Sequence, residues 1–509
     1  MEQDYYLRIG RAGNLTDFKE RLLYRFFEML PGLLSIGFLG GAVVASWLWP
    51  VQASFFMIAF ALYWLLRTLY FLFHLKTGYD KMRLYEKTDW IKKLEQFPEW
   101  RSIYHLVILP TYKESFEILH QTIRALSQAD YPKDHLIVVF GIEEAEGETG
   151  EEKARLAEQE FGKDFFSFLI TRHPRGRAGE IAGKGSNETW AAKEAVRNII
   201  EKHGISKNRV IVSSFDADTV VFPSYFSCLT YQFLAAKDPF HTSFQPVPLF
   251  LNNIWEAPAI SKIFGFSSTF WYTINQERPE KLITYSSHSM SLRALLDVGY
   301  KQTDVVSDDS RIFWQCFLRY DGNYRVQPLS YPVSMDANVA SSLWGTLRNI
   351  YRQQRRWAYG VADIPYFLFG FLKNKKIPLS KKLSLGLELI EGHLSWATAP
   401  ILLFFVGWLP VLLGGSEFSH TLLAYNLPGL TSRILTLAGI GLILSAIISV
   451  NLLPPRKPEY GKVRVVLFAL QWVLFPLTMV FFAALPALDA QIRLMLGRYM
   501  GFWHTPKFR

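Results

Sequence analysis

Cysteine is scarce in this chain, and several common signatures are missing. Two cysteines occur in 509 residues, Cys228 and Cys316, without a C-x-x-C spacing. This argues against a zinc site or a disulfide framework and is compatible with a reducing cytosol around the soluble part. There is also no Lys/Arg-rich block, nucleic-acid module or P-loop sequence, so the net charge of +10 favours an anionic membrane surface or a phosphorylated substrate over nucleic acid.

Apolar stretches occupy both ends of the chain. The sequence is 50% hydrophobic but still 20% charged, a mixture that suits a membrane protein with a large soluble domain. Residues 28–76 hold two apolar runs separated by Pro50, each long enough to cross a bilayer core of about 30 Å, and they predict a transmembrane hairpin. The C-terminal region 376–490 holds three more runs, at about 394–414, 433–453 and 464–487.

The distribution of basic residues predicts the orientation. Segment 1–27 is basic and is expected to be cytosolic or interfacial. Loop 415–432 has no Lys or Arg, whereas 454–464 carries four of them. The positive-inside rule places the second loop in the cytosol, and the soluble domain follows an even number of crossings. We therefore expect an integral protein of a bacterial inner membrane or a plasma membrane, with its soluble domain in the cytosol.

The central region 80–375 alternates short β-type runs with helical patterns. The runs are YHLVILP (104–110), HLIVVFGI (135–142), FFSFLI (165–170) and RVIVSSF (209–215). Such alternation predicts an α/β domain with a parallel sheet. Sheets of this kind bind ligands beyond the carboxyl ends of their strands.

Two acids, Asp216 and Asp218, follow the last of these runs directly. Asp is common in turns after strands. Two hard oxygen donors at a strand end also suit Mg²⁺ or Mn²⁺ bound against a phosphate. A D-x-D sequence alone does not decide between the two interpretations.

Four other stretches carry candidate chemistry. The turn LPTYKE (109–114) offers backbone N–H groups for a base or phosphate, or is a simple strand-to-helix turn. The basic glycine loop 172–187 suits a diphosphate, or is a solvated loop. Asp308 and Asp309 open a helical pattern, where acids are also common caps. In IYRQQRRWAYG (350–360), Arg356 offers fixed charge for a leaving phosphate, and Trp357 offers a flat face for a sugar. The same pattern is also typical of a basic interfacial helix with an aromatic anchor.

Taken in order, P-T-Y-K-E, G-K-G-S-N, D-A-D, S-D-D and Q-Q-R-R-W resemble the membrane-integrated family-2 glycosyltransferases of the Q-x-x-R-W type. That family includes cellulose, chitin and hyaluronan synthases and ceramide glucosyltransferases. The resemblance implies an α/β GT-A type domain with N- and C-terminal transmembrane helices. Segment 491–509 resembles the family's W-x-x-T-P-K element near the active site, here Trp503, Thr505, Pro506 and Lys507.

The resemblance also implies roles for single residues. Asp309 would be the catalytic base and Asp308 would take the Glu position of T-E-D. Asp216 and Asp218 would contact the nucleotide and its Mn²⁺ or Mg²⁺. The acceptor and diphosphate would meet Gln353, Arg356 and Trp357. The donor nucleotide would meet Pro110, Thr111, Tyr112, Glu114, Glu143 and Lys184.

Some features depart from the family pattern. Glu143 and Glu144 stand where an acid pair of the D-D-G type is usual, and His288 stands near a usual G-[ST]-N step. Pro476 interrupts the last apolar run, so we expect one C-terminal segment to be broken, re-entrant or interfacial. The implied donor is a nucleotide-sugar, and the acceptor is a growing polysaccharide or a membrane lipid. A non-catalytic nucleotide-sugar-binding scaffold is the alternative from another class.

Overall fold

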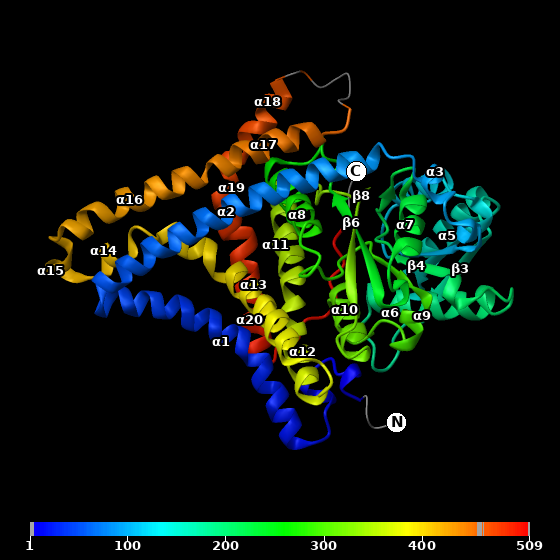
Figure 1. The fold of residues 1–509 in the computed structure, drawn as a ribbon, viewed down its shortest axis with the longest axis horizontal. Coiled ribbons are helices and arrows are strands. Elements are labelled where there is room, and N and C mark those ends of the chain that lie inside the picture. Colours follow the sequence, from blue (N-terminus) through cyan, green and yellow to red (C-terminus); the bar gives the residue numbers. More distant parts are fainter. Residues whose placement is uncertain (1–4, 456–460, 462, 507–509) are drawn as a thin grey trace.

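A computed structural model describes residues 5–455, 461 and 463–506. Figure 1 shows two parts, long helices on one side and an α/β domain on the other. Three basic residues used to predict orientation, Arg456, Lys457 and Lys462, lie outside the described residues, as does Lys507.

Eight strands form one mixed sheet in the order β3-β2-β1-β4-β7-β6-β8-β5. The first four of this order are parallel to one another, as predicted. The other half departs from the parallel prediction, because β7 is antiparallel to both of its neighbours and β5 to β8. The strands are β1 (Tyr104–Pro110), β2 (Leu136–Glu143), β3 (Ser167–His173), β4 (Val210–Ser214), β5 (Val220–Val221), β6 (Thr242–Leu249), β7 (Ser289–Ser291) and β8 (Arg325–Ser334).

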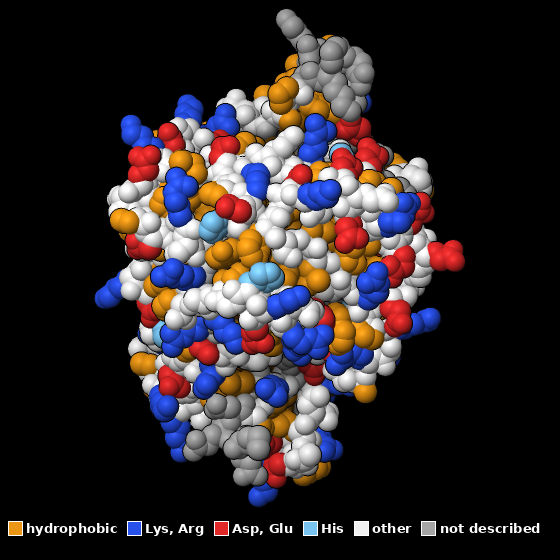
Figure 2. All heavy atoms as spheres, turned by 90° about the vertical axis from the view of Figure 1, so that its right-hand side faces the viewer, with side chains coloured by type: hydrophobic (Ala, Val, Ile, Leu, Met, Phe, Trp, Pro, Cys, Tyr) orange, Lys and Arg blue, Asp and Glu red, His pale blue; other side chains and the backbone are white. Residues whose placement is uncertain are grey.

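Helices cover both faces of the sheet. Side chains alternate along β1, so Leu106 and Ile108 pack in one core with Ala191 of α6, while Val107 and Leu109 pack in the other with Leu119 of α4. The helices of this part are α3 (Trp90–Leu94), α4 (Phe116–Ser127), α5 (Glu148–Phe161), α6 (Lys184–Ala195), α7 (Tyr225–Ala235), α8 (Ala259–Gln276), α9 (Leu292–Asp297), α10 (Asp308–Arg319), α11 (Leu343–Ala358) and α12 (Asp363–Lys373). On the face turned away from the long helices, basic and acidic side chains are interspersed (Figure 2).

Among the described residues, four helical stretches are long and apolar enough to cross a membrane: Phe18–Leu48, Pro50–Glu86, Leu422–Leu452 and Val463–Met495. Large apolar side chains such as Trp47, Phe55 and Phe73 are exposed on the first two, as expected for helices that face lipid. The long-helix part consists of α1 (Phe18–Leu48), α2 (Pro50–Glu86), α13 (Leu379–Phe405), α14 (Leu409–Leu413), α15 (Gly415–Ser419), α16 (Leu422–Ala438), α17 (Ile440–Leu452), α18 (Val463–Leu470), α19 (Phe475–Thr478) and α20 (Leu485–Met495).

Two segments differ from simple crossings. The stretch 394–414 is divided between α13 and α14, because the helix ends at Phe405 before Pro410, and it is not among the four. The last stretch is interrupted by a 3₁₀ turn at Gln471–Leu474 and a π-helical turn at Met479–Ala484, which brackets the predicted break at Pro476. Figure 1 shows α19 and α20 running across the direction of α1 and α2, between the long helices and the α/β domain.

The first long helix, α1, contacts the end of the last helix, α20. Asp17 caps α1 by accepting a hydrogen bond from the backbone N–H of Glu20, so this helix begins within the basic segment 1–27 and continues through the first apolar run. Arg25 of α1 donates to the carbonyl groups of Leu494 and Met495 at the end of α20. This contact directs the chain after α20 towards the α/β domain.

Candidate active site

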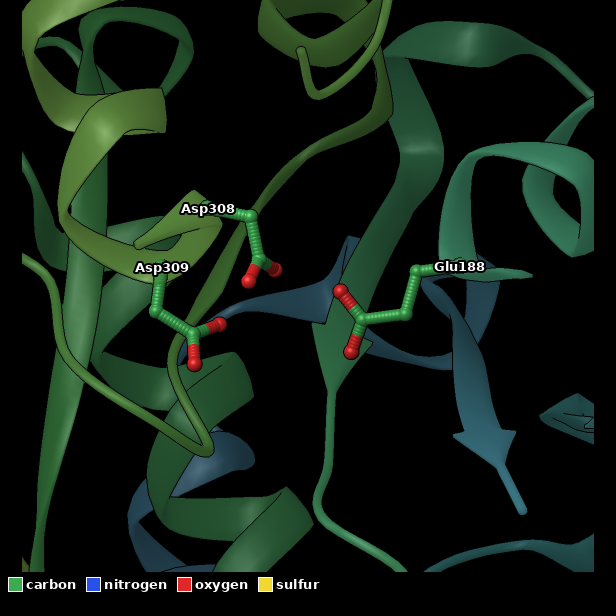
Figure 3. Close-up of side chains that lie close together, drawn as sticks. All are labelled: Glu188, Asp308 and Asp309. Carbon is green, nitrogen blue, oxygen red and sulfur yellow. The ribbon is translucent and has the colours of Figure 1, made fainter. Parts of the chain in front are cut away.

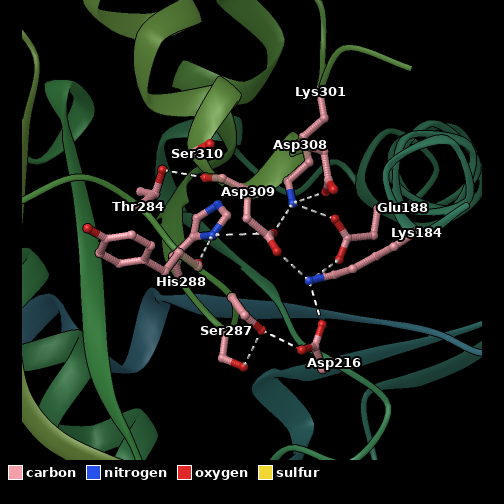
Figure 4. A network of polar contacts seen from close by, with 12 residues as sticks. Lys184, Glu188, Asp216, Thr284, Ser287, His288, Lys301, Asp308, Asp309 and Ser310 are labelled. Carbon is pink, nitrogen blue, oxygen red and sulfur yellow. Dashed lines mark hydrogen bonds and ion pairs between the residues drawn. The ribbon is translucent and has the colours of Figure 1, made fainter. Parts of the chain in front are cut away.

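The candidate active site is a cluster of acids and lysines beyond the carboxyl ends of β1 and β4. Lys184 opens α6 and extends to the acid that follows β4, with its Nζ 2.6 Å from Asp216 Oδ1. The same Nζ is 2.9 Å from Oδ2 of Asp309, at the start of α10. Three motifs that are far apart in the sequence therefore meet at one cation (Figure 4).

A second lysine, Lys301, completes the cluster from the loop before α10. Its Nζ is 2.9 Å from Asp309 Oδ1, 3.1 Å from Asp308 Oδ2 and 2.5 Å from Glu188 Oε2. Figure 4 shows both ammonium groups between the carboxylates. Neither Lys301 nor Glu188 was predicted from the sequence. The one available signal was the position of Glu188, one helical turn after Lys184.

Glycines allow the two helix starts to approach each other. A Cβ on Gly185 would lie 2.7 Å from the Cβ of Asp308, and a Cβ on Gly183 would lie 2.5 Å from the ring of Phe502. Real Cβ atoms do not approach so closely, so any larger residue would separate α6 from α10 or from the C-terminal segment. The glycines of G-K-G-S-N thus have a packing role.

The protonation states follow from burial and from the lysines. Burial by itself raises the pKa of Asp309, but Lys184 and Lys301 outweigh it and hold this pKa well below its usual range. Burial raises the pKa of Glu188 to about 7 against the opposing effect of Lys301 and Lys184. Burial and the neighbouring Asp309 also raise the pKa of Asp308. Asp309 is therefore the most strongly ionised acid of the three.

The three acids Glu188, Asp308 and Asp309 could be mistaken for a metal site. Their oxygens lie within 4.8 Å of one another, and Figure 3 shows the carboxylates pointing towards a common centre. Two ammonium groups already bind oxygens of all three acids and lie between these carboxylates. We therefore assign this cluster to the lysines.

The predicted metal ligands lie next to the cluster. Asp216 has a partly exposed side chain, 27% accessible, and accepts a hydrogen bond from Ser286 Oγ at 2.6 Å. Asp218 is buried, and its Oδ2 accepts from the backbone N–H of Asp336 at 2.9 Å. Carboxylate oxygens are the donors that Mg²⁺ and Mn²⁺ take, so the pair fits the predicted ion in chemistry.

Arg356 and Trp357 of the predicted Q-x-x-R-W motif point to different neighbours. The Arg356 guanidinium lies 4.9 Å from the Phe502 ring centre, and its Nε has no hydrogen-bond partner among the described residues. Burial lowers the pKa of Arg356, an effect opposed by Asp216, Asp308 and Asp309. Trp357 packs against Phe250, away from the acids. Gln353 accepts a hydrogen bond from Asn338 at 3.2 Å.

The turn at residues 109–114, predicted to contact the nucleotide, is covered in part by the C-terminal segment. Pro110 ends β1, and the buried Thr111 Oγ1 has no hydrogen-bond partner among the described residues. Glu114 accepts from the backbone N–H of Tyr112 at 2.6 Å. His504 of the C-terminal segment packs edge-on against Tyr112 and lies 3.7 Å from Glu114.

Not all predicted contacts converge on the cluster. Glu143 is buried between Asn187, at 3.0 Å, and His173, at 2.9 Å. In the basic glycine loop, Arg172 pairs with Glu151 and Arg177 with Glu180, so Lys184 is the basic residue of this loop whose contacts reach the acids.

His288, left open by the sequence, is buried and hydrogen-bonded. Its Nδ1 donates to the carbonyl of Tyr285 at 2.8 Å and lies 3.9 Å from Asp309 Oδ1. Burial, with a contribution from Lys301, lowers the pKa of His288 to about 3, so its ring is neutral. This favours a structural role over an acid–base one.

No protein family model and no curated protein matches this sequence. Among solved structures, the chain is similar to a mannosyltransferase from Pyrobaculum calidifontis in complex with GDP-Man and Mn²⁺, with 15% identity, 87% of this chain and 100% of that chain covered, and a TM-score of 0.45. It is also similar to residues 1–349 of S. aureus TarS in complex with UDP-GlcNAc, with 12% identity, coverage of 78% and 93%, and a TM-score of 0.36. Likeness at this level does not assign a reaction.

Proposed function

We propose that this protein is an inverting, membrane-bound glycosyltransferase of the GT-A type. It moves a sugar from a nucleotide-sugar to a growing β-linked polysaccharide, at the cytosolic face of the membrane. One observation carries the proposal. Lys184, Asp216 and Asp309 come from three separate motifs and meet within ion-pair distance beyond the strand ends.

In the proposed reaction, Asp309 takes the proton of the acceptor hydroxyl. The acceptor oxygen forms a bond to the anomeric carbon as the bond from that carbon to the diphosphate oxygen breaks. The electron pair leaves with the nucleoside diphosphate. A single displacement inverts the anomeric centre, so an α-linked donor yields a β-glycoside.

The leaving diphosphate gains negative charge, and two cations of this chain are suited to stabilise it. Lys184 is already shared between Asp216 and Asp309, and Arg356 is half-buried, with a buried Nε that has no hydrogen-bond partner among the described residues. Such preorganised charge acts where charge develops in the transition state. Mn²⁺ or Mg²⁺ bound by Asp216 and Asp218 would add positive charge at the same place. On the other side, Thr111 and Tyr112 would contact the nucleoside.

A membrane lipid is the second candidate acceptor. Leu343 and Trp344 are 60% and 82% exposed at the start of α11, the helix that carries Arg356. Exposed apolar side chains on the helix that carries Arg356 suit contact of this helix with a bilayer, from which a lipid acceptor would come. The two acceptors give products of very different size.

The test is transfer by purified protein in lipid nanodiscs, with Mn²⁺ and a panel of radiolabelled UDP- and GDP-sugars. A long product that a polysaccharide hydrolase degrades would support the synthase. A small lipid-soluble product would move the proposal to glycolipid synthesis. Binding of a nucleotide-sugar without transfer to either acceptor would reject the enzyme and favour the scaffold.

A further inference from the structure

Lys301 belongs to none of the sequence motifs, yet it contacts three of the four acids of the candidate site. It lies between α9 and α10 and is 4% exposed. A buried lysine is costly unless paired, and this one is bound by carboxylates from both α6 and α10. The position of Lys301 is therefore not explained by its place in the loop between α9 and α10 alone.

The loop holds Lys301 firmly. Thr189 of α6 donates its hydroxyl to the Lys301 carbonyl at 2.9 Å, and the next residue, Gln302, donates its backbone N–H to Gln315 of α10 at 3.2 Å. The lysine is thus anchored at its backbone by the same two helices that its ammonium group joins.

The two lysines hold different oxygens of Asp309. Lys301 binds Oδ1, whereas Lys184 binds Oδ2 and also the partly exposed Asp216 on the donor side. Under the proposed function an incoming diphosphate would compete for Lys184, because this lysine is more exposed than Lys301, at 11% against 3%. Lys301 is retained by Glu188 and Asp308, which are both buried.

We propose that Lys301 is a positioning residue: it fixes Asp309 through Oδ1 and keeps it ionised while Lys184 turns to the donor diphosphate and frees Oδ2 for the acceptor hydroxyl. This inference rests on the proposed function for its chemical meaning. It assigns different duties to two lysines that look equivalent in the cluster.

Several charged or titratable groups influence Asp309 besides these lysines. The neutral His288 does not compete with Lys301 as a cation. With Lys184 displaced, Lys301 is the remaining ammonium group in contact with the carboxylate among the described residues. The groups that face or influence Asp309 are Lys184 and Glu188 on α6, Asp216 after β4, Tyr272 on α8, His288 before β7, Lys301, Asp308 on α10 and Arg356 on α11.

The first test compares Lys301→Met with Lys301→Arg in the transfer assay across pH. Loss of one cation at this distance raises the pKa of a carboxyl group by about 1–3 units. The acid limb is the fall of the transfer rate at low pH. We expect the acid limb of the Met variant to move to higher pH by that amount, and the acid limb of the Arg variant to stay near wild type. A purely structural lysine would lower the yield of folded protein without moving the limb.

A second readout needs no turnover. Carbodiimide coupling with an amine detects protonated, accessible carboxyl groups, and Asp309 is 21% exposed whereas Asp308 is 4%. Peptide mass spectrometry should show Asp309 modified at higher pH in Lys301→Met than in wild type. Identical labelling curves in folded proteins would overturn the proposal.

Two further variants control the labelling test: one removes an unrelated buried lysine, and the other balances the lost charge. Lys262→Met removes another buried lysine, one that packs over Phe468 away from the acids, and its labelling curve should match wild type. Lys301→Met with Glu188→Gln removes one charge of each sign and should fold while keeping the shifted curve. Unfolding of both Met variants at position 301 would show a purely structural lysine and overturn the proposal.

The outcomes also separate this inference from the proposed function. If wild type transfers sugar, and the pH–rate profile and labelling curve of Lys301→Met match those of wild type, only the proposed role of Lys301 is rejected. No transfer from any donor, with a shifted labelling curve, rejects the glycosyltransferase and leaves the coupling of Lys301 to Asp309 in place.

Discussion

Two charged clusters lie side by side on α10 and are built in opposite ways. Arg311 pairs with a single acid, Asp363, at 2.7 Å, and three more of its N–H groups donate to Gln302, Ala362 and Ile9. Two residues earlier, Asp309 belongs to a group in which four carboxylates share two ammonium groups. The first cluster is matched and closed. The second has surplus acid and is partly open to solvent.

The difference separates a stabilising pair from a reactive one. A closed pair has no charge left for a ligand, and breaking it leaves a buried charge without a partner. A cluster with more acids than cations can take up a proton, and its partly exposed member Asp216 is accessible to a ligand. Variants in the two clusters should therefore affect different observables.

The largest effect is expected for Asp309→Asn. Loss of a general base slows transfer by about 10²–10⁴-fold. The melting temperature should hold, because Lys184 and Lys301 keep other acid partners. Initial rates and thermal melts of the same preparation measure both. Transfer within a few-fold of wild type would remove Asp309 from the reaction.

Asp363→Asn should show the opposite pattern. The uncompensated Arg311 would cost about 3–5 kcal/mol of stability, while the rate per folded molecule stays at the wild-type value. Denaturation and active-fraction measurements test this. A stable Asp363→Asn protein with slow sugar transfer would show that the two clusters do not differ in function as described.

Arg356→Met tests the third cation near the acids. A hydrogen bond to a charged group contributes about 1.5–3 kcal/mol, so we expect transfer to fall by about 10- to 100-fold. Arg356→Lys should recover only part of this rate, because a point charge replaces a planar fork. Equal rates for all three proteins would place the diphosphate elsewhere.

Gly185→Ala tests the close approach of α6 to α10. The added methyl group meets Asp308, and overpacking of this kind costs about 1–3 kcal/mol. Gly392→Ala on α13 is the matched control, because its Cβ would meet nothing within 4 Å. Equal melts for the two variants would contradict the packing described at the helix start.

The smallest effect concerns pH and His173. Burial alone would lower its pKa, but Glu143 and Glu180 outweigh burial and raise it. The stability from this contact is present below the unfolded pKa of about 6.5 and is lost as pH rises through the folded value. His173→Gln should flatten this alkaline decline in melting temperature. A decline that persists in the variant would assign it to another group.

The sequence allowed much of the site to be predicted because its residues follow elements with strong patterns. Asp216 comes directly after a buried strand, and Lys184 and Asp309 begin amphipathic or glycine-marked helices. Parallel strands bring such positions to one edge of a sheet. The mixed half of the sheet was not predicted, because strand direction there depends on long-range pairing that local patterns do not encode.

Other features had no local signal. Lys301 lies in an irregular loop, and its partners are 7, 8 and 113 residues away in the sequence. Glu143 was expected to meet the donor nucleotide, but it is buried against Asn187 and His173, which lie in segments that the sequence did not connect to it.

Sugar transfer by Asp309→Asn and by Asp363→Asn, measured side by side and corrected for the folded fraction of each protein, decides whether Asp309 takes part in the reaction. We predict a stable protein with transfer slowed by about 10²–10⁴-fold for the first, and a less stable protein with wild-type transfer for the second. Wild-type transfer by Asp309→Asn would contradict this prediction, because the acid at the centre of the cluster would then have no part in the reaction.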